Sequence, residues 1–194
     1  MYESIPGRAF TGEREHVRTG DESMLYFSYG SNMLSERLRT RAPSCKPIGV
    51  AHLAGHVLRF HKRSGDGSGK CNALRSCDTS DLVVGVLYEI RKAERNTLDN
   101  AEFLGRGYDR VLSIVELGDS ACSVEAEVYF ALDHVIDDTL LPYSWYKELV
   151  VAGAREHGLP SEYIANIVSH PTTKDSDPRR EQLHLKLLGN GDDS

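Results

Sequence analysis

The residues Tyr29-Gly30-Ser31-Asn32 follow an apolar segment and have the composition of a tight turn that can bind a ligand. A glycine in such a turn lets the backbone N–H groups of neighbouring residues point into one concavity, which suits a carboxylate or a developing oxyanion. The same residues can form a purely structural connection from strand to helix, in which Asn32 caps the helix. Composition alone favours this structural interpretation and leaves the anion-binding one open.

Glu102 is the second residue with a candidate chemical role. It lies four residues after Leu98, so on a helix the two side chains would share one buried face. A carboxylate directed toward a core is costly unless it is paired, hydrogen-bonded, or working with a raised pKa as a general base. If the helix ends at Ala101, Glu102 is instead an exposed residue at the helix end, and the pattern does not decide between these alternatives.

Other polar residues give weaker signals. Glu94 lies on the same side of the expected helix, but Arg91 and Arg95 flank it and favour a solvated ion pair. Three tyrosines are placed near the candidate site, although most tyrosines at such positions pack with the hydroxyl reaching water. They are Tyr108, Tyr129 and Tyr146.

Several common motifs are excluded by their spacing. Ser31 is not in G-x-S-x-G, because Met33 occupies the position of the last glycine. Residues 64–70 lack the first glycine of a P-loop and have Cys71 where serine or threonine is required. His52, His56 and His61 are too irregularly spaced for a helical metal site. The four cysteines form no CxxC pair, which disfavours structural zinc and favours packed or half-packed thiols in a reducing compartment.

Composition places these residues in an ordinary globular chain. The 194 residues carry a formal net charge of −6, which argues against binding to nucleic acid. Hydrophobic residues make up 40% and charged residues 27%, as in globular domains. No apolar stretch is long enough for a membrane span and the N-terminus has no apolar signal segment, so we expect a cytoplasmic protein without a membrane partner.

The elements that must position the candidate residues follow from local patterns. Residues 1–23 are polar without periodicity and predict a flexible leader, residues 24–170 a single domain, and residues 171–194 a tail. Within the tail, four leucines could dock as a strand or a helix: Leu183, Leu185, Leu187 and Leu188. Strands are predicted over 24–29, 48–60 as a bent strand or a strand pair, 72–75, 82–90, 108–117 and 122–132.

Helices are expected between and after these strands. One or two helical turns over 33–38 and a helix over 91–102 interrupt the strands, and residues 160–168 form a short helix near the end. Another helix is expected to open at Leu141-Pro142, with proline in the first turn, and to end near His157 before Gly158. Glu125 and Glu127 alternate with apolar residues, so the strand that carries them should have one wet face. This order predicts an α+β fold around a small, mainly antiparallel β-barrel with flanking helices.

Three segments together resemble the γ-glutamylcyclotransferase family. They are Leu25-Tyr26-Phe27-Ser28-Tyr29-Gly30-Ser31-Asn32-Met33, Leu98-Asp99-Asn100-Ala101-Glu102, and a segment from Tyr146-Lys147 to Gly153-Ala154-Arg155-Glu156-His157-Gly158-Leu159-Pro160. Their order and spacing agree over about residues 25–170. The resemblance implies a small β-barrel with a cavity at one side, and no metal or organic cofactor. It also implies a reaction in which the α-amine of a γ-glutamyl group attacks its own γ-carbonyl, releasing 5-oxoproline and an amine or amino acid.

Site residues follow from the resemblance by position. The turn from Tyr29 through Gly30, Ser31 and Asn32 to Met33 would hold the γ-glutamyl group through backbone N–H groups. Glu102 would act as the general acid and base. The three tyrosines would line the cavity. Ring closure is intramolecular, so such an enzyme needs mainly orientation, one base and an oxyanion site.

Two departures from the family pattern bear on the substrate. The family commonly has glycine after the catalytic glutamate, where this chain has Phe103, and the glycine-rich segment 64–70 lies where relatives vary. The expected partner is a small-molecule substrate, a γ-glutamyl amino acid or a related γ-glutamyl amide, with γ-glutamylamines or a γ-glutamyl-protected biosynthetic intermediate as alternatives. A module that binds γ-glutamyl compounds without turnover is a further alternative, which the presence of Glu102 opposes. The chain is expected to be a monomer or a homodimer.

Overall fold

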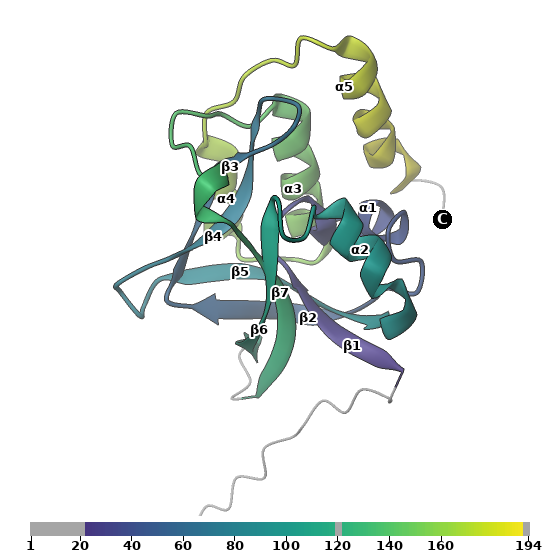
Figure 1. The fold of residues 1–194 in the computed structure, drawn as a ribbon, viewed down its shortest axis with the longest axis vertical. Coiled ribbons are helices and arrows are strands. Elements are labelled where there is room, and N and C mark those ends of the chain that lie inside the picture. Colours follow the sequence, from purple (N-terminus) through teal and green to yellow (C-terminus); the bar gives the residue numbers. More distant parts are fainter. Residues whose placement is uncertain (1–21, 119–121, 192–194) are drawn as a thin grey trace, which may run out of the picture.

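A closed barrel of five strands forms the centre of the molecule (Figure 1). The computed structural model describes residues 22–118 and 122–191, so the predicted leader lies outside the described residues except for Glu22 and Ser23. The barrel order is β1 (Ser23–Ser28), β5 (Leu82–Arg91), β2 (Lys46–Ala54), β6 (Tyr108–Leu117) and β7 (Ser123–Ala131). A separate two-stranded sheet consists of β3 (His56–Arg63) and β4 (Gly69–Arg75).

Antiparallel pairing dominates the barrel. Strand β1 runs antiparallel to β5, with Tyr26 opposite Tyr88, and β6 runs antiparallel to β7 along its whole length. The barrel closes where β1 meets β7 in parallel, with Tyr26 opposite Glu127. Only Gly55 separates β2 from β3 in the sequence. The two strands nevertheless do not pair with each other, because they belong to different sheets. The predicted α+β fold with a mainly antiparallel barrel is confirmed.

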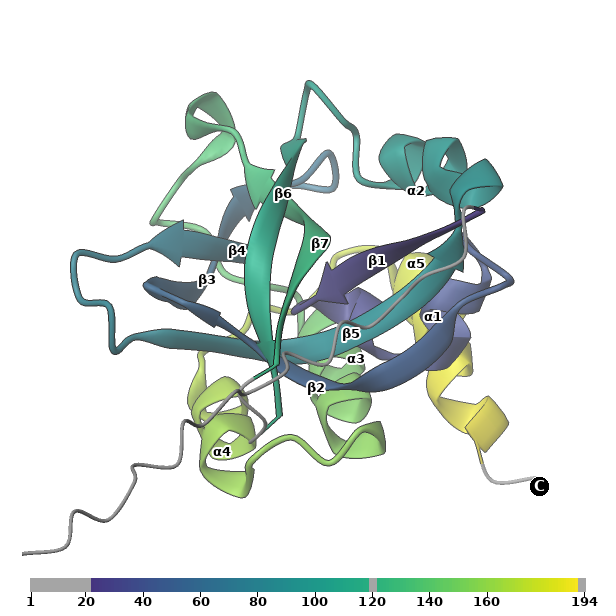
Figure 2. The same ribbon diagram turned by 90° about the horizontal axis from the view of Figure 1, so that it is seen from below.

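The helices gather beside the barrel (Figure 2). They are α1 (Ser35–Arg39), α2 (Arg95–Ala101), α3 (Ser144–Glu156), α4 (Ser161–Ser169) and α5 (Pro178–Leu185). Short 3₁₀ turns lie at Ser31–Met33, Lys92–Glu94, Asp133–Val135 and Lys186–Gly191. The four leucines of the tail, Leu183, Leu185, Leu187 and Leu188, therefore lie in helical segments.

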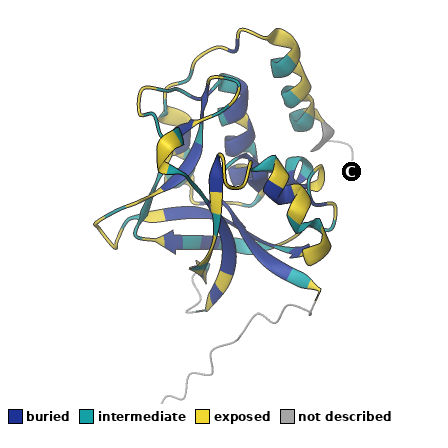
Figure 3. Ribbon diagram, in the orientation of Figure 1, coloured by how far each residue is buried: buried dark blue, intermediate teal, exposed yellow. Residues whose placement is uncertain are grey.

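Helix α3 packs its apolar face on the barrel and on the first 3₁₀ turn, Ser31–Met33, which is called the 3₁₀ turn below. Trp145, Leu149 and Val150 are almost completely buried along this face, and Figure 3 shows the buried residues concentrated where strands and α3 meet. At Gly153 the helix lies so close to the turn that a Cβ atom there would be 2.3 Å from the backbone nitrogen of Leu34. The helix ends before Gly158, whose φ of +67° is the left-handed conformation of a helix C-terminus.

The tail is held against α3 by a buried carboxylate. Asp175 is 2% exposed and accepts a hydrogen bond from the indole nitrogen of Trp145 over 2.8 Å. Its other partner is Arg180, whose Nε donates to it over 2.7 Å. The hydrogen bond from Arg180 lowers the pKa of Asp175, although burial opposes this shift. Helix α5 is thereby fixed against α3, and His184 of α5 reaches Arg37 of α1.

Two local expectations were wrong. Helix α3 begins at Ser144 with Tyr143 as its N-cap, so Pro142 precedes the helix instead of occupying its first turn. Glu127 does not face water: its side chain is 7% exposed and pairs with Arg95 and Arg110. The alternation of β7 therefore predicts the exposed Glu125 correctly and fails for Glu127, because arginines from α2 and β6 neutralise a carboxylate beside the barrel seam.

In the part of the chain that the structure describes, no helix is long and apolar enough to cross a membrane. Within the same residues, no group of three or more His, Cys, Asp or Glu side chains is arranged to hold a metal ion. The four cysteines are free thiols: Cys45 and Cys71 are buried and Cys122 is half-buried, as expected, whereas Cys77 is exposed.

Candidate active site

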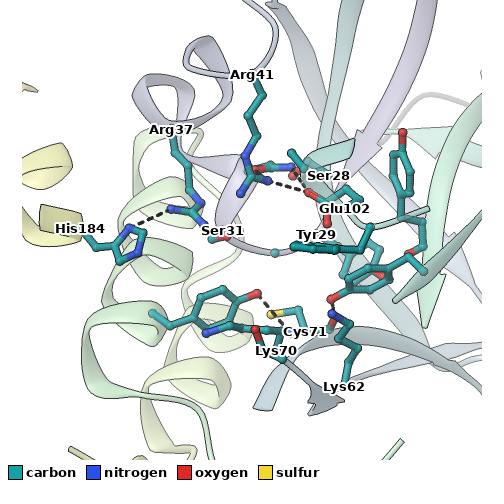
Figure 4. Close-up of a pocket in the computed structure, with 18 of the residues that line it drawn as sticks. Ser28, Tyr29, Ser31, Arg37, Arg41, Lys62, Lys70, Cys71, Glu102 and His184 are labelled. Atoms are coloured by element: carbon teal, nitrogen blue, oxygen red, sulfur yellow. Dashed lines mark hydrogen bonds and ion pairs between the residues drawn. The ribbon is translucent and has the colours of Figure 1, made fainter. Parts of the chain in front are cut away.

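A cavity of about 210 Å³ opens beside the 3₁₀ turn, between the end of β1, the end of α2, the β3–β4 hairpin and helix α3 (Figure 4). Its wall includes nearly all of the predicted site residues. They are Tyr29, Gly30, Ser31, Asn32, Glu102, Tyr108, Tyr129 and Tyr146. The fold thus brings together residues from four separate parts of the sequence.

Glu102 is the residue directly after α2, and its side chain is only 15% exposed. The Nδ2 atom of Asn32 donates to its Oε1 over 2.9 Å, and Nη1 of Arg41 donates to the same oxygen over 2.6 Å. Arg41 also donates to Oδ1 of Asn32 over 2.7 Å, so the three side chains form a closed triangle. The helix does end at Ala101, yet the carboxylate is paired and directed into the cavity. Among the described residues nothing donates to Oε2, which leaves this oxygen available to a ligand.

The turn presents its backbone to the cavity. Within the described part of the chain, no group accepts a hydrogen bond from the N–H of Ser31 or Asn32, whereas Met33 N donates to the carbonyl of Gly30 over 2.9 Å. Met33 is fully buried beneath the turn and lies outside the cavity wall. Asn32 does not cap the following helix, because its side chain is held by Glu102, Arg41 and Tyr26.

Gly30 lets the turn approach the opposite wall. A Cβ atom there would lie 3.2 Å from the Cβ of Cys71 and 3.5 Å from the hydroxyl of Tyr146. These distances leave little room for a side chain at this position. The requirement for glycine in the turn is therefore one of space at the cavity edge.

The predicted tyrosines form the walls and use their hydroxyls within the protein. Tyr108 donates to the carbonyl of Cys71 over 2.7 Å, and Tyr146 accepts from the Cys71 N–H over 3.2 Å. Tyr129 donates to Asp99 over 2.7 Å. Burial raises the pKa of Tyr29, Tyr108 and Tyr146 well above the ordinary value, so these phenols stay protonated. We conclude that the tyrosines shape the cavity and fix β4, while Glu102 is the carboxylate that is hydrogen-bonded to the turn.

The sequence analysis missed the cationic residues of the cavity. They are Arg37, Arg41, Lys62 and Lys70, accompanied by Asp66 and His184. The spacing of Arg37 and Arg41, four residues apart just after the turn, is a signal that could have placed both on one helical face. Lys62 gives no such signal, because it follows the buried His61 and so breaks the alternation of β3.

The cations differ in their partners. Nζ of Lys70 lies 2.8 Å from Asp66 in the β3–β4 hairpin, so the glycine-rich segment 64–70 is an ordered wall of the site. Lys62 is 6% exposed, and its Nζ lies 4.7 Å from the ring centroid of Tyr108. Burial lowers the pKa of both lysines.

Glu94 and Phe103 lie at the two ends of α2. Glu94 accepts hydrogen bonds from the backbone and hydroxyl of Ser44, in place of the expected ion pair with its arginine neighbours. Phe103, directly after Glu102, has a φ of +55°, a left-handed conformation that favours glycine. The physical reason for a glycine after the glutamate is thus visible, and this chain meets the same backbone requirement with a phenylalanine.

Comparison with known proteins identifies relatives over most of the chain. The AIG2-like family model matches residues 82–167. The γ-glutamylcyclotransferase of Homo sapiens is 31% identical over 160 residues, which cover 80% of this chain and 82% of the human one. The γ-glutamylcyclotransferase of Bos taurus is 31% identical over 155 residues, covering 77% of this chain and 80% of the bovine one.

A solved structure described as a γ-glutamyl cyclotransferase has the same fold. It superposes with a TM-score of 0.75 at 27% identity, covering 85% of this chain and 99% of that structure. Sequence identity, coverage and fold agree with the resemblance carried by the turn, the glutamate and the glycine-containing helix. The chain belongs to the γ-glutamylcyclotransferase family of enzymes.

Proposed function

We propose that this enzyme cyclises the γ-glutamyl group of a γ-glutamyl amino acid, releasing 5-oxoproline and the free amino acid, with Glu102 as general acid and base. One observation carries the proposal: the Glu102 carboxylate projects into the cavity beside the turn, with Oε1 fixed by Asn32 and Arg41 and with Oε2 available. A carboxylate oriented in this way can take a proton from a bound ammonium.

The reaction follows from these positions. The α-ammonium of the substrate gives a proton to Oε2 of Glu102, and the neutral nitrogen attacks the γ-carbonyl carbon. The new C–N bond closes a five-membered ring, and the carbonyl oxygen becomes an oxyanion that accepts from the N–H groups of Ser31 and Asn32. Glu102 then returns this proton to the amide nitrogen and takes the second proton from the ring nitrogen, and the bond from the amide nitrogen to carbon breaks as the carbonyl re-forms. The released amine takes that second proton from Glu102 and leaves as an ammonium, which restores the carboxylate. Atoms and charge balance without water or a cofactor.

The cavity contributes mainly orientation. Ring closure is unimolecular, so holding the α-nitrogen against the γ-carbonyl removes much of the barrier. The rigid walls formed by Tyr108, Tyr129 and Tyr146 are suited to a folded-back substrate, because their hydroxyls are already tied to Cys71 and Asp99.

The test measures 5-oxoproline release from γ-glutamyl-alanine and γ-glutamyl-ethylamide by wild type, Glu102→Gln and a control. Glu125→Gln is the matched control, because Glu125 is an exposed carboxylate on β7. We expect wild type and the control to release 5-oxoproline, and Glu102→Gln to lose at least about 100-fold in kcat while remaining folded. Full turnover by folded Glu102→Gln would show that Glu102 is not the general acid and base. If wild type released no 5-oxoproline from either compound, the proposed reaction would be wrong.

A further inference from the structure

The cavity contains more positive charge than the protein itself neutralises. Four cations line it, Arg37, Arg41, Lys62 and Lys70, together with two carboxylates, Asp66 and Glu102. Arg41 pairs with Glu102 over 2.6 Å and Lys70 with Asp66 over 2.8 Å. Among the described residues, no carboxylate pairs with Arg37 or Lys62. Two positive charges in the cavity are therefore left for a ligand.

Lys62 is a buried ammonium on the Glu102 side of the cavity (Figure 4). Its Nζ lies over the ring of Tyr108, 4.7 Å from the centroid, and 6.0 Å from the ring centroid of Phe103, the residue next to Glu102. A buried charge without an anionic partner is costly to the folded protein. Such a charge gains most from a ligand that brings a carboxylate to it.

Arg37 lies across the cavity from Lys62, on the side of helix α5 (Figure 4). Its Nη1 donates to Nδ1 of His184 over 3.3 Å, and its Nε is buried without a partner. The imidazole of His184 stacks on Trp145 with ring centroids 4.0 Å apart, which fixes the position of the acceptor. A guanidinium held in this way has N–H groups left to bind a planar carboxylate.

We propose that these two cations bind the two carboxylates of the substrate: Lys62 the α-carboxylate of the γ-glutamyl group, and Arg37 the carboxylate of the leaving amino acid. The proposal rests on the function proposed above. The α-amine and α-carboxylate share one carbon, so Lys62, the cation on the Glu102 side of the cavity that pairs with no described carboxylate, receives the α-carboxylate when the amine reaches the base. The leaving group extends from the other side of the γ-carbonyl, toward Arg37.

The assignment predicts the substrate class. A γ-glutamyl amino acid carries two carboxylates and satisfies both cations, whereas a γ-glutamylamine carries one and leaves Arg37 unpaired in the cavity. Because an unpaired buried charge penalises binding, the enzyme should prefer amino acids to amines as leaving groups. Arg37 is then the residue that determines this preference.

The experiment compares γ-glutamyl-alanine with γ-glutamyl-ethylamide, which differ only by the carboxylate of the leaving group. The quantity measured is the ratio of kcat/KM for the two substrates, which is independent of the fraction of folded enzyme. Wild type should favour γ-glutamyl-alanine by on the order of 10- to 100-fold. Arg37→Gln should bring the ratio close to one, and Arg39→Gln, an exposed arginine on the same helix, should retain the wild-type ratio.

Lys62→Gln supplies the complementary result. It should lower kcat/KM for both substrates by a similar factor and keep their ratio, because both carry the α-carboxylate. Inhibition by 5-oxoproline, which has only that carboxylate, should weaken by about 10-fold or more in Lys62→Gln and much less in Arg37→Gln.

Several outcomes would overturn the assignment. They are a wild-type ratio near one, an unchanged ratio in Arg37→Gln, and a ratio that collapses in Lys62→Gln instead. In each of these cases wild type still releases 5-oxoproline, so the proposed function survives. If wild type releases none from either substrate, both proposals are wrong.

Discussion

Nη1 of Arg41 donates to Oε1 of Glu102 over 2.6 Å and to Oδ1 of Asn32 over 2.7 Å, so one guanidinium joins the carboxylate to the 3₁₀ turn. The side chains of Arg41 and Glu102 are 20% and 15% exposed, which shields the pair from solvent. The turn and the end of α2 are 70 residues apart in sequence, measured from Asn32 to Glu102, and this contact sets their relative position.

Replacing Arg41 by glutamine should therefore impair catalysis more than binding. The carboxylate loses one of the two groups that orient it, and a misplacement of about 1 Å can cost on the order of 100-fold in rate. We expect kcat for γ-glutamyl-alanine to fall by about 10- to 100-fold with a smaller change in KM. Steady-state kinetics and circular dichroism check this, with Arg39→Gln as the control for charge. An unchanged kcat would show that Asn32 alone suffices to orient Glu102.

Much of the fold was predictable because it depends on local patterns. The strand over 108–117 coincides with β6, and the expected helix over 91–102 covers the separate 3₁₀ turn Lys92–Glu94 and α2. The spacing of apolar residues and the position of turn-forming residues determine such elements, largely independently of contacts with the rest of the chain. Glu102 could be selected for a similar local reason, because it follows a buried leucine at helical spacing.

The cationic half of the site depends on contacts that the local sequence does not encode. Lys62 comes from the β3–β4 hairpin, and His184 reaches Arg37 across 147 positions in the chain. Glu127 was misplaced for the same reason, since only the folded barrel brings Arg95 and Arg110 to it. A buried charge is stable only beside a partner that neutralises it or forms a hydrogen bond with it, and here those partners are distant in sequence.

The left-handed backbone at Phe103 leads to a prediction about stability. Its φ is +55°, a conformation that costs an ordinary residue roughly 1–2 kcal/mol and that asparagine tolerates better. The side chain is 56% exposed, so little apolar burial is lost on replacement. Phe103→Asn should raise the melting temperature relative to Phe103→Ala, which removes the ring and keeps the strain. A higher melting temperature for the alanine variant would show that the ring matters more than the backbone.

Gly153 should be intolerant of even a methyl group. A Cβ atom there would lie 2.3 Å from Leu34 N and 2.5 Å from the carbonyl carbon of Met33, both of them backbone atoms. Helix α3 must then move away from the turn, so Gly153→Ala should reduce the free energy of unfolding by about 1–3 kcal/mol.

Chemical denaturation measures this change, and Gly49→Ala is the control because its Cβ meets nothing within 4 Å. Elsewhere in helices, replacing glycine by alanine stabilises by roughly 0.5–1 kcal/mol. The sign of the change at Gly153 thus separates the close helix–turn contact from intrinsic helix propensity. A gain in stability at Gly153 would contradict the packing described above.

His184 should make the docking of α5 dependent on pH. Burial, together with Arg37 and Lys70, lowers its pKa from 6.5 to about 4. The unfolded chain therefore binds a proton at a higher pH than the folded protein does. The contribution of this residue to stability is complete above about pH 6.5 and is lost as the pH falls toward 4.

The measurement is the melting temperature of wild type and His184→Gln between about pH 4.5 and pH 7.5, a range that includes the ordinary pKa of 6.5 and approaches the lowered pKa of about 4. Glutamine does not titrate, and its carbonyl can still accept from Arg37. It loses the stacking on Trp145, so wild type should be the more stable protein at neutral pH. The difference between the two should shrink steadily as the solution is acidified, because only wild type has His184 to protonate. A difference that stays constant or grows would show that His184 is already charged in the folded protein, and that it holds Arg37 in some other way.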